Sequence, residues 1–202
     1  GGNASVLRDQ RDELVKQLSS MADVKVSDDS SGYTVSLSNG QPLVSGKTAG
    51  QLSAGTDGNG NSTLTLKFST SEFSLNPSAG GQLGALYDYE TGTLKQMSDS
   101  VQGMAEAVAN LFNDQLAKGY DLNGNAGKPL FNFDLSNPAG MLQVNDLTPE
   151  ELALSGDPNE PGNGDNLKEL IELKNQKTNI PGLGNMSLNE GAAAIISTIG
   201  IA

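Results

Sequence analysis

The feature that most limits what this chain can fold into is a run of regularly spaced apolar residues between positions 94 and 111. They follow one another at alternating steps of three and four: Leu94, Met97, Val101, Met104, Val108 and Leu111. This spacing places all of them along one side of an α-helix. Good helix formers fill most other positions from 82 to 117, whereas Gly92 and Gly103 oppose a helix. The stretch predicts one long helix whose apolar seam packs against other helices.

A first helix is predicted from residue 4 to residue 22. Leu7, Leu14 and Met21 recur every seven residues, while charged side chains fill the opposite side. One narrow apolar stripe on a charged helix is typical of the edge of a helical bundle or of a coiled coil. A free-standing charged helix is the alternative.

Three shorter helices are predicted in the last third of the chain. Thr148 opens the first with a capping box that Glu151 completes, and this helix ends by residue 156. The second runs from residue 165 to 176. A second capping box, from Ser187 to Glu190, opens the third, whose apolar pattern continues to the end of the sequence. These segments are the expected partners of the seam.

Between the first and the long helix the pattern changes to a period of two, which is typical of strands with one buried face. Apolar residues alternate there with polar ones: Tyr33, Val35, Leu37, Leu64, Leu66 and Phe68. Asn39-Gly40 is a strong hairpin signal, and residues 57–61 form a second turn. Pro77 to Gly81 separate this region from the long helix.

These patterns together predict an α+β chain. Residues 3–22 and 82–202 are expected to form one discontinuous, elongated helical bundle, with a small antiparallel β domain inserted at residues 23–81. If the seam faces the core of the bundle, aspartate in place of Val101 or Val108 should unfold it, because each would bury an unpaired charge.

The composition excludes several classes of function. The chain has 12 basic and 24 acidic residues, a net charge of −12, and no cluster of Lys or Arg. Such a surface repels nucleic acid and anionic membranes, so neither is expected as a partner. No apolar run approaches the roughly 18 residues that cross a bilayer. The sequence also lacks His and Cys, which removes the commonest general base and the usual zinc ligands.

Any catalysis would therefore rest on carboxylates, Lys or Tyr, for example on a pair of glycosidase carboxylates. Three pairs of acidic residues are close in sequence: Asp88 and Glu90, Glu150 and Glu151, Glu169 and Glu172. Helix or turn positions explain them as solvated charge, and the chain has no Trp to stack against a sugar. We predict no catalytic residue, no cofactor and no enzymatic activity.

Asp121, Asn123 and Asn125 place side-chain oxygens at alternate positions, as the front of a calcium loop does. An EF-hand loop needs Gly at its sixth position and Glu at its twelfth, where this chain has Ala126 and Asn132. These residues are therefore weak metal candidates, and a tight turn built from Asn and Gly is the favoured interpretation.

Several stretches, taken in this order, resemble the FlgK family of bacterial flagellar hook-associated proteins, which join the hook to the filament. They are LRDQRDELVKQLS at 7–19, GYTVSLSNGQPLVSGKTAGQL at 32–52, GGQLGAL at 80–86, AEAVANLFNDQLAKGYDLNGNAG at 105–127 and SLNEGAAAIISTIG at 187–200. The chain departs from the family pattern at Gln115, where His is expected.

The resemblance implies a structural, non-enzymatic subunit. Such a subunit is secreted through the flagellar export apparatus, a type III system, and serves motility outside the cell. Implied partners are other copies of the protein in a ring, the hook protein, neighbouring hook-associated or filament proteins, and an export chaperone that binds a terminus. Family members carry terminal heptad helices, and neither is present here, so the chain is expected to be a central fragment.

Two alternatives remain from the residues alone. One is a secreted adhesin-like or calcium-binding module that uses the β domain and the loop at residues 121–127. The other is a different axial protein, such as a flagellin or a filament cap, against which the hairpin and loop sequences argue.

Overall fold

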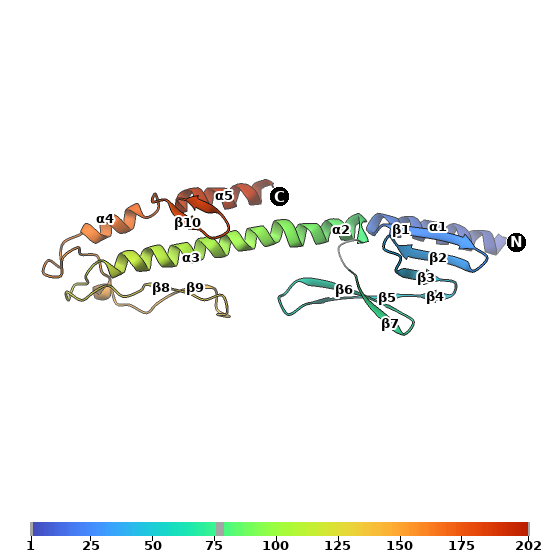
Figure 1. Cartoon of the computed structure of the whole chain (residues 1–202), viewed down its shortest axis with the longest axis horizontal. Helices are drawn as coiled ribbons and strands as arrows, with labels where there is room; N and C mark the ends of the chain where they lie inside the picture. Colours follow the sequence, from blue (N-terminus) through green and yellow to red (C-terminus); the bar gives the residue numbers. More distant parts are fainter. Residues whose placement is uncertain (1, 76–78, 202) are drawn as a thin grey trace. The chain divides into compact units, whose positions relative to one another are not determined.

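The computed structural model describes residues 2–75 and 79–201, and Figure 1 shows its elements. Helices alternate along the chain with small antiparallel sheets, so the predicted α+β class is confirmed. The contacts divide the chain into two compact units, residues 1–93 and residues 94–202.

The first unit starts with helix α1 (Gly2–Met21) and continues into a four-stranded antiparallel sheet. The strands lie side by side in chain order: β1 (Val24–Asp29), β2 (Gly32–Leu37), β3 (Pro42–Ser45) and β4 (Thr48–Ala49). The predicted Asn39-Gly40 turn joins β2 to β3. Gly40 adopts a φ of 89°, which glycine tolerates better than other residues, and its N–H donates to the Leu37 carbonyl at 2.9 Å.

A three-stranded antiparallel sheet follows in the same unit. Its strands are also in chain order: β5 (Gln51–Thr56), β6 (Ser62–Phe68) and β7 (Ser71–Leu75). The predicted turn at residues 57–61 joins β5 to β6. Leu66 is paired with Leu52 on one side and Phe73 on the other, and it is buried.

Helix α1 packs on the first sheet of its own unit. Val15 and Leu18 of α1 contact a core that includes Val35 and Leu37 of β2. Without α1 this apolar face of the sheet would be exposed to water, at a cost of about 25 cal/mol for each Å². The contacts therefore divide the chain differently from the prediction, which joined residues 3–22 to 82–202 and set 23–81 apart.

The β region begins and ends at one point of the first unit, as an insertion requires. The Asp23 N–H donates to the Ala79 carbonyl at 2.7 Å. Gly81 lies so close to the end of α1 that an added Cβ would stand 2.8 Å from the Ala22 nitrogen. Residues 76–78, which hold part of the predicted break at Pro77 to Gly81, are outside the described residues.

The long helix predicted for residues 82–117 forms without a break, but its middle is irregular. Helix α2 (Gly81–Asp88) gives way to a π-helical segment, η2 (Tyr89–Leu94), before helix α3 (Lys95–Ala117). Gly92 lies in η2 and weakens an α-helix at this place. The Thr91 hydroxyl also donates to the Tyr87 carbonyl at 2.9 Å, a contact that tends to bend helices. The boundary between the two units falls at the end of η2.

Helix α3 is the central element of the second unit. The other elements are β8 (Phe131–Phe133), β9 (Leu142–Val144), α4 (Asp165–Glu172), β10 (Thr178–Ile180), β11 (Gly184–Met186) and α5 (Leu188–Ile201). Figure 1 shows the β8–β9 hairpin along one side of α3, with α4, β10 and α5 along the other, and α3 contacts each of these five elements.

The capping boxes were predicted correctly, but only one of them opens an α-helix. The Ser187 hydroxyl accepts from the Glu190 N–H at 3.1 Å, and α5 follows. Thr148 opens only a 3-10 turn, η3 (Pro149–Glu151), because the chain becomes extended at Leu152 and buries Ala153 in the core. Helix α4 also ends earlier than predicted, and strands β10 and β11 were not predicted.

Candidate functional site

The predicted seam is covered only along part of its length. Met104, Val108 and Leu111 pack against a core cluster that includes Ile180 of β10 and Leu188 at the start of α5. These three residues therefore pack α3 against β10 and α5.

The other three seam residues lie closer to the start of α3. Met97 lines a small cavity of about 210 Å³ together with Leu183 and Ile195. Leu94 and Val101 are 43% and 40% exposed, so neither is part of a core in the described structure. The structure thus brings three of the seam residues together in one cluster and leaves two in solvent.

Three of the four buried residues of α3 are small, and the fourth is Leu116. Gly103, Ala107 and Ala109 are all buried. A Cβ added to Gly103 would overlap the carbonyl oxygen of Pro181, in the turn between β10 and β11. From the sequence alone Gly103 only opposed a helix, and its role in packing was not predicted. The signal that could have found it is the pair of small residues at positions 103 and 107, four apart on one side of a helix.

A buried amide joins the end of α3 to the start of α4. Asn166 is 4% exposed, and its Oδ1 accepts from Nε2 of Gln115 at 2.7 Å. Its Nδ2 donates to the carbonyl oxygens of Gln115 at 3.2 Å and Ala153 at 2.6 Å. The oxygen and the nitrogen of the buried Asn166 amide thus both have hydrogen-bond partners, and these bonds fix α4 against the end of α3. No pattern in the sequence pointed to Asn166.

Asp121, the first of the weak metal candidates, is 3% exposed and lies inside its own turn. Its Oδ1 accepts from the N–H groups of Asn123 and Asn125, both at 2.8 Å, and its Oδ2 accepts from Nδ2 of Asn125 at 3.3 Å. Burial acts to raise the pKa of Asp121, but the N–H donors of Asn125 and Asn123 act to lower it, and the net shift is downward. The carboxylate therefore serves as a turn-forming acceptor, which agrees with the favoured interpretation of this loop.

The same loop occurs in the first unit at residues 57–61. There Oδ1 of Asp57 accepts from the N–H groups of Asn59 at 2.8 Å and Asn61 at 2.9 Å. Hydrogen bonds from Asn61 and Asn59 lower the pKa of Asp57. The repeated sequence Asp-x-Asn-Gly-Asn thus specifies one local structure in two settings, an exposed hairpin tip and a buried turn. Within the described residues, no group of three or more His, Cys, Asp or Glu side chains is arranged to hold a metal ion.

An ion pair ties the loop after Asp121 to the first capping box. Lys128 donates from Nζ to Glu151 Oε1, while Glu151 Oε2 accepts from the Thr148 N–H at 3.0 Å. The hydrogen bond with Lys128 lowers the pKa of Glu151, and the same contact raises the pKa of Lys128. Glu151 is thus a cap that also anchors a loop.

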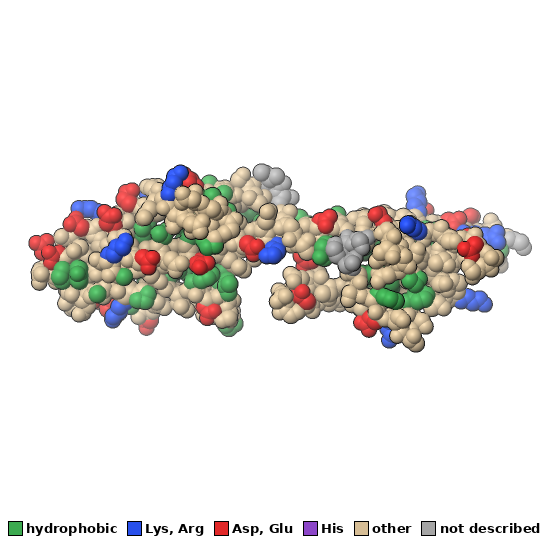
Figure 2. All heavy atoms as spheres, viewed as in Figure 1, with side chains coloured by type: hydrophobic (Ala, Val, Ile, Leu, Met, Phe, Trp, Pro, Cys, Tyr) green, Lys and Arg blue, Asp and Glu red, His purple; other side chains and the backbone are tan. Residues whose placement is uncertain are grey.

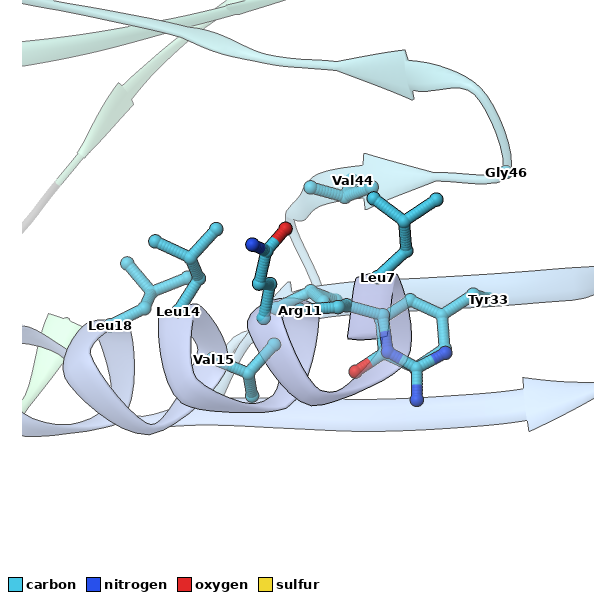
Figure 3. A pocket seen from close by; sticks show the side chains of 10 residues that line it. Leu7, Arg11, Leu14, Val15, Leu18, Tyr33, Val44 and Gly46 are labelled. Carbon is cyan, nitrogen blue, oxygen red and sulfur yellow. The ribbon is translucent and has the colours of Figure 1, made fainter. Parts of the chain in front are cut away.

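A groove of about 530 Å³ lies between α1 and the first sheet, and Figure 3 shows its lining. Leu7 and Leu14 of α1 line one side and remain 65% exposed. On the other side lies Tyr33, whose ring is covered by the Arg11 guanidinium at 4.0 Å from the ring centroid. The groove is thus an apolar surface with one cation held against an aromatic ring.

The surface carries mixed charge. Figure 2 shows acidic and basic side chains interspersed on the visible face, with apolar patches between them. No helix in the described part of the chain is long and apolar enough to cross a membrane.

A comparison with protein families decides which family this arrangement represents. The profile described as "Flagellar hook-associated protein FlgK helical domain" matches residues 1–131, well over half of the chain. The chain belongs to the FlgK family.

Individual relatives agree with this family. The chain is 35% identical over 142 residues to "Flagellar hook-associated protein 1" of Salmonella typhimurium, which covers 66% of this chain and 25% of the relative. It is 34% identical over 140 residues to the protein of the same name from Escherichia coli K12, covering 65% of this chain and 25% of the relative. This FlgK-family chain therefore spans about a quarter of the length of the curated relatives it matches.

A solved structure extends the likeness to the fold. It is described as the flagellar hook junction protein FlgK from Burkholderia pseudomallei, and it superimposes with a TM-score of 0.58 at 34% sequence identity. The match covers 63% of this chain and 25% of that one. The resemblance inferred from the sequence to the FlgK family is thus confirmed.

Proposed function

We propose that this FlgK-family chain is part of a structural subunit that joins the hook of the bacterial flagellum to its filament. The observation that carries the proposal is the family match over residues 1–131, together with relatives named as hook-associated and hook junction proteins. The subunit acts mechanically and has no catalytic role.

The local roles of the acidic residues support a non-enzymatic function. Asp57 and Asp121 are acceptors within their own turns, and Glu151 and Glu190 are helix or turn caps. Each of these carboxylates already accepts hydrogen bonds that hold the fold together. None of them is thereby available as the opposed acid and base that hydrolysis of a glycoside requires.

Assembly in this proposal occurs by helix packing and lateral contacts between subunits. The partners are other copies of the protein in a ring, the hook protein, and neighbouring hook-associated or filament proteins. The exposed apolar residues of α1, with Leu7 and Leu14 at 65% exposure, provide a surface of the kind that such contacts bury.

The place of action is outside the cell, on the flagellum. The chain reaches it through the flagellar export apparatus, with an export chaperone bound at a terminus of the complete protein. The sequence contains no Cys, so no disulfide has to be broken before the chain unfolds for export. The net charge of −12 argues against membranes and nucleic acid as partners.

Deletion of the gene tests the proposal. Electron microscopy of the mutant cells should show hooks without filaments, and the filament protein should be released into the medium. The full-length gene should restore filaments when supplied in trans, and so should the version with Val101→Asp, because Val101 is exposed. The version with Val108→Asp should fail. Filaments of normal number and length on the deletion strain would refute the proposal.

A further inference from the structure

The chain contains four Asn-Gly pairs, which are Asn39-Gly40, Asn59-Gly60, Asn123-Gly124 and Asn163-Gly164. In such a pair no side chain shields the glycine nitrogen, so this nitrogen can attack the neighbouring asparagine side chain. The reaction needs a glycine N–H that can give up its proton. The four pairs differ in whether the glycine N–H donates a hydrogen bond in the structure.

Three of the glycine N–H groups are engaged in closing turns. Gly40 donates to the Leu37 carbonyl at 2.9 Å, Gly60 to the Asp57 carbonyl at 3.0 Å, and Gly124 to the Asp121 carbonyl at 3.1 Å. Attack by any of these nitrogens requires the hydrogen bond to break first. The three pairs are therefore protected as long as the chain is folded.

The fourth pair is different. Among the described residues there is no acceptor for the Gly164 N–H, and a Cβ built on Gly164 would meet no atom within 4 Å. The side chain under attack is already held in place. Oδ1 of Asn163 accepts from the Asp165 N–H at 2.8 Å and the Gly156 N–H at 3.5 Å, and its Nδ2 donates to Glu160 Oε2 at 3.3 Å.

We propose that Asn163 is a site of spontaneous deamidation in the folded protein, with water as the only co-reactant. The Gly164 nitrogen loses its proton to hydroxide and forms a bond to Cγ of Asn163. The Cγ–Nδ2 bond then breaks, and the nitrogen leaves as ammonia with a proton from water. Water opens the resulting cyclic imide at either of its carbonyls, which gives aspartate or isoaspartate.

The neighbours of Asn163 favour this reaction. The N–H groups of Asp165 and Gly156 point at the oxygen on which negative charge develops during the attack, and fixed donors stabilise such charge. Glu160 is a positioning residue, because its carboxylate accepts from Nδ2 of Asn163 and so restrains the amide.

The modification would act on α4. Isoaspartate adds one methylene group to the main chain just before this helix, whose Asn166 and Leu170 are buried against the end of α3. The aspartate product keeps an acceptor for the Asp165 N–H and leaves the main chain unchanged, although it loses the donor to Glu160. The isoaspartate form should therefore have a less firmly docked α4 than either the parent or the aspartate form.

The test is to incubate the whole chain in mildly alkaline buffer and measure deamidation of each peptide by mass spectrometry, with and without denaturing urea. In the folded protein Asn163 should react roughly tenfold faster than Asn39, Asn59 and Asn123, since each of those must first break a hydrogen bond. In urea the four rates should converge. Equal rates at the four sites in the folded protein would overturn the proposal.

A pair of variants isolates the attacking nitrogen. Gly164→Ala places a methyl group beside that nitrogen and should remove most of the reactivity at Asn163, and the φ of −95° at this position accepts alanine. Gly162→Ala is the matched control, because it is in the same loop and also meets no atom within 4 Å. It should leave the rate at Asn163 unchanged. Deamidation of Gly164→Ala at the parent rate would contradict the mechanism.

Discussion

Gly103 of α3 lies directly against the carbonyl group of Pro181, with no room for a side chain between them. The turn between β10 and β11 can approach α3 this closely only because position 103 lacks a Cβ. Ile180, the residue before Pro181, is fully buried in the same cluster as Ala107. The packing of the second unit thus depends on a glycine in the middle of a helix.

Gly103→Ala should therefore destabilise the protein, although alanine is the better helix former. Overpacking of a tight contact costs about 1–3 kcal/mol, which exceeds the gain of about 1 kcal/mol in helix propensity. Gly92→Ala is the matched control, since no atom lies within 4 Å of its added Cβ. That variant should be neutral or stabilised by about 0.5 kcal/mol. Urea unfolding followed by circular dichroism measures both, and equal stabilities would mean that the Pro181 contact is not formed.

Two valines of the seam should respond differently to the same substitution. Val108 packs against the cluster around Ile180, so Val108→Asp should cost about 2 kcal/mol or more in the free energy of unfolding. Val101 is 40% exposed, and Val101→Asp should change stability by no more than about 0.5 kcal/mol. The sequence alone predicted that both would unfold the domain. Equal large losses in urea unfolding would show that Val101 is covered after all.

The hydrogen bonds between Gln115 and Asn166 should be energetically coupled. Asn166→Ala leaves the buried Ala153 carbonyl without its donor, so it should cost about 1–3 kcal/mol. Gln115→Ala removes one of the bonds to the same amide. In a double-mutant cycle the two losses should fall short of additivity by about 0.5–1 kcal/mol. Strict additivity would mean that these two side chains do not interact in solution.

Asp121 should make the second unit sensitive to acid. Its pKa in the folded chain lies below the unfolded value of about 3.9. The ionised carboxylate therefore contributes fully to the free energy of unfolding above that value, and this contribution is lost as the pH falls through the folded pKa. Asp121→Asn replaces one acceptor by a donor that faces Nδ2 of Asn125. This variant should be less stable at neutral pH and lose less stability on acidification. Urea midpoints from neutral pH down to about pH 3 measure the difference.

Asp57→Asn provides the comparison for that experiment. Residues 57–61 have the same loop pattern but form an exposed hairpin tip. Asp57→Asn should therefore lose less free energy of unfolding at neutral pH than Asp121→Asn does. An acid dependence of Asp121→Asn as steep as that of the parent would show that another carboxylate is responsible.

Local signals in the sequence predicted local structure well. The Asn39-Gly40 turn, the capping box from Ser187 to Glu190 and the turn at Asp121 all formed as expected, because each depends on hydrogen bonds within five residues. The choice of partners was not predictable in the same way. Residues Val15 and Leu18 face the first sheet while Leu7 and Leu14 remain exposed, and no periodicity distinguishes them.

The candidate site shows the same limit. Periodicity correctly placed Met104, Val108 and Leu111 on one side of a helix. It did not show that Val101 stays 40% exposed while Met97, nearer the start of α3, lines a cavity with Ile195 of α5. Asn166 and Gly103 are important through contacts with residues far away in the sequence. No pattern in a single chain names the partners in such contacts. The small residues at positions 103 and 107 are consistent with a close approach to the helix but do not point to Pro181, and nothing in the sequence points to Asn166.

The most direct test of the central claim is the position of the protein on the flagellum. Antibodies raised against this chain and coupled to gold should be imaged by electron microscopy on isolated flagella. Labelling confined to the junction between hook and filament is the result that the proposed function predicts. Labelling along the whole filament, or on the cell surface away from flagella, would contradict it.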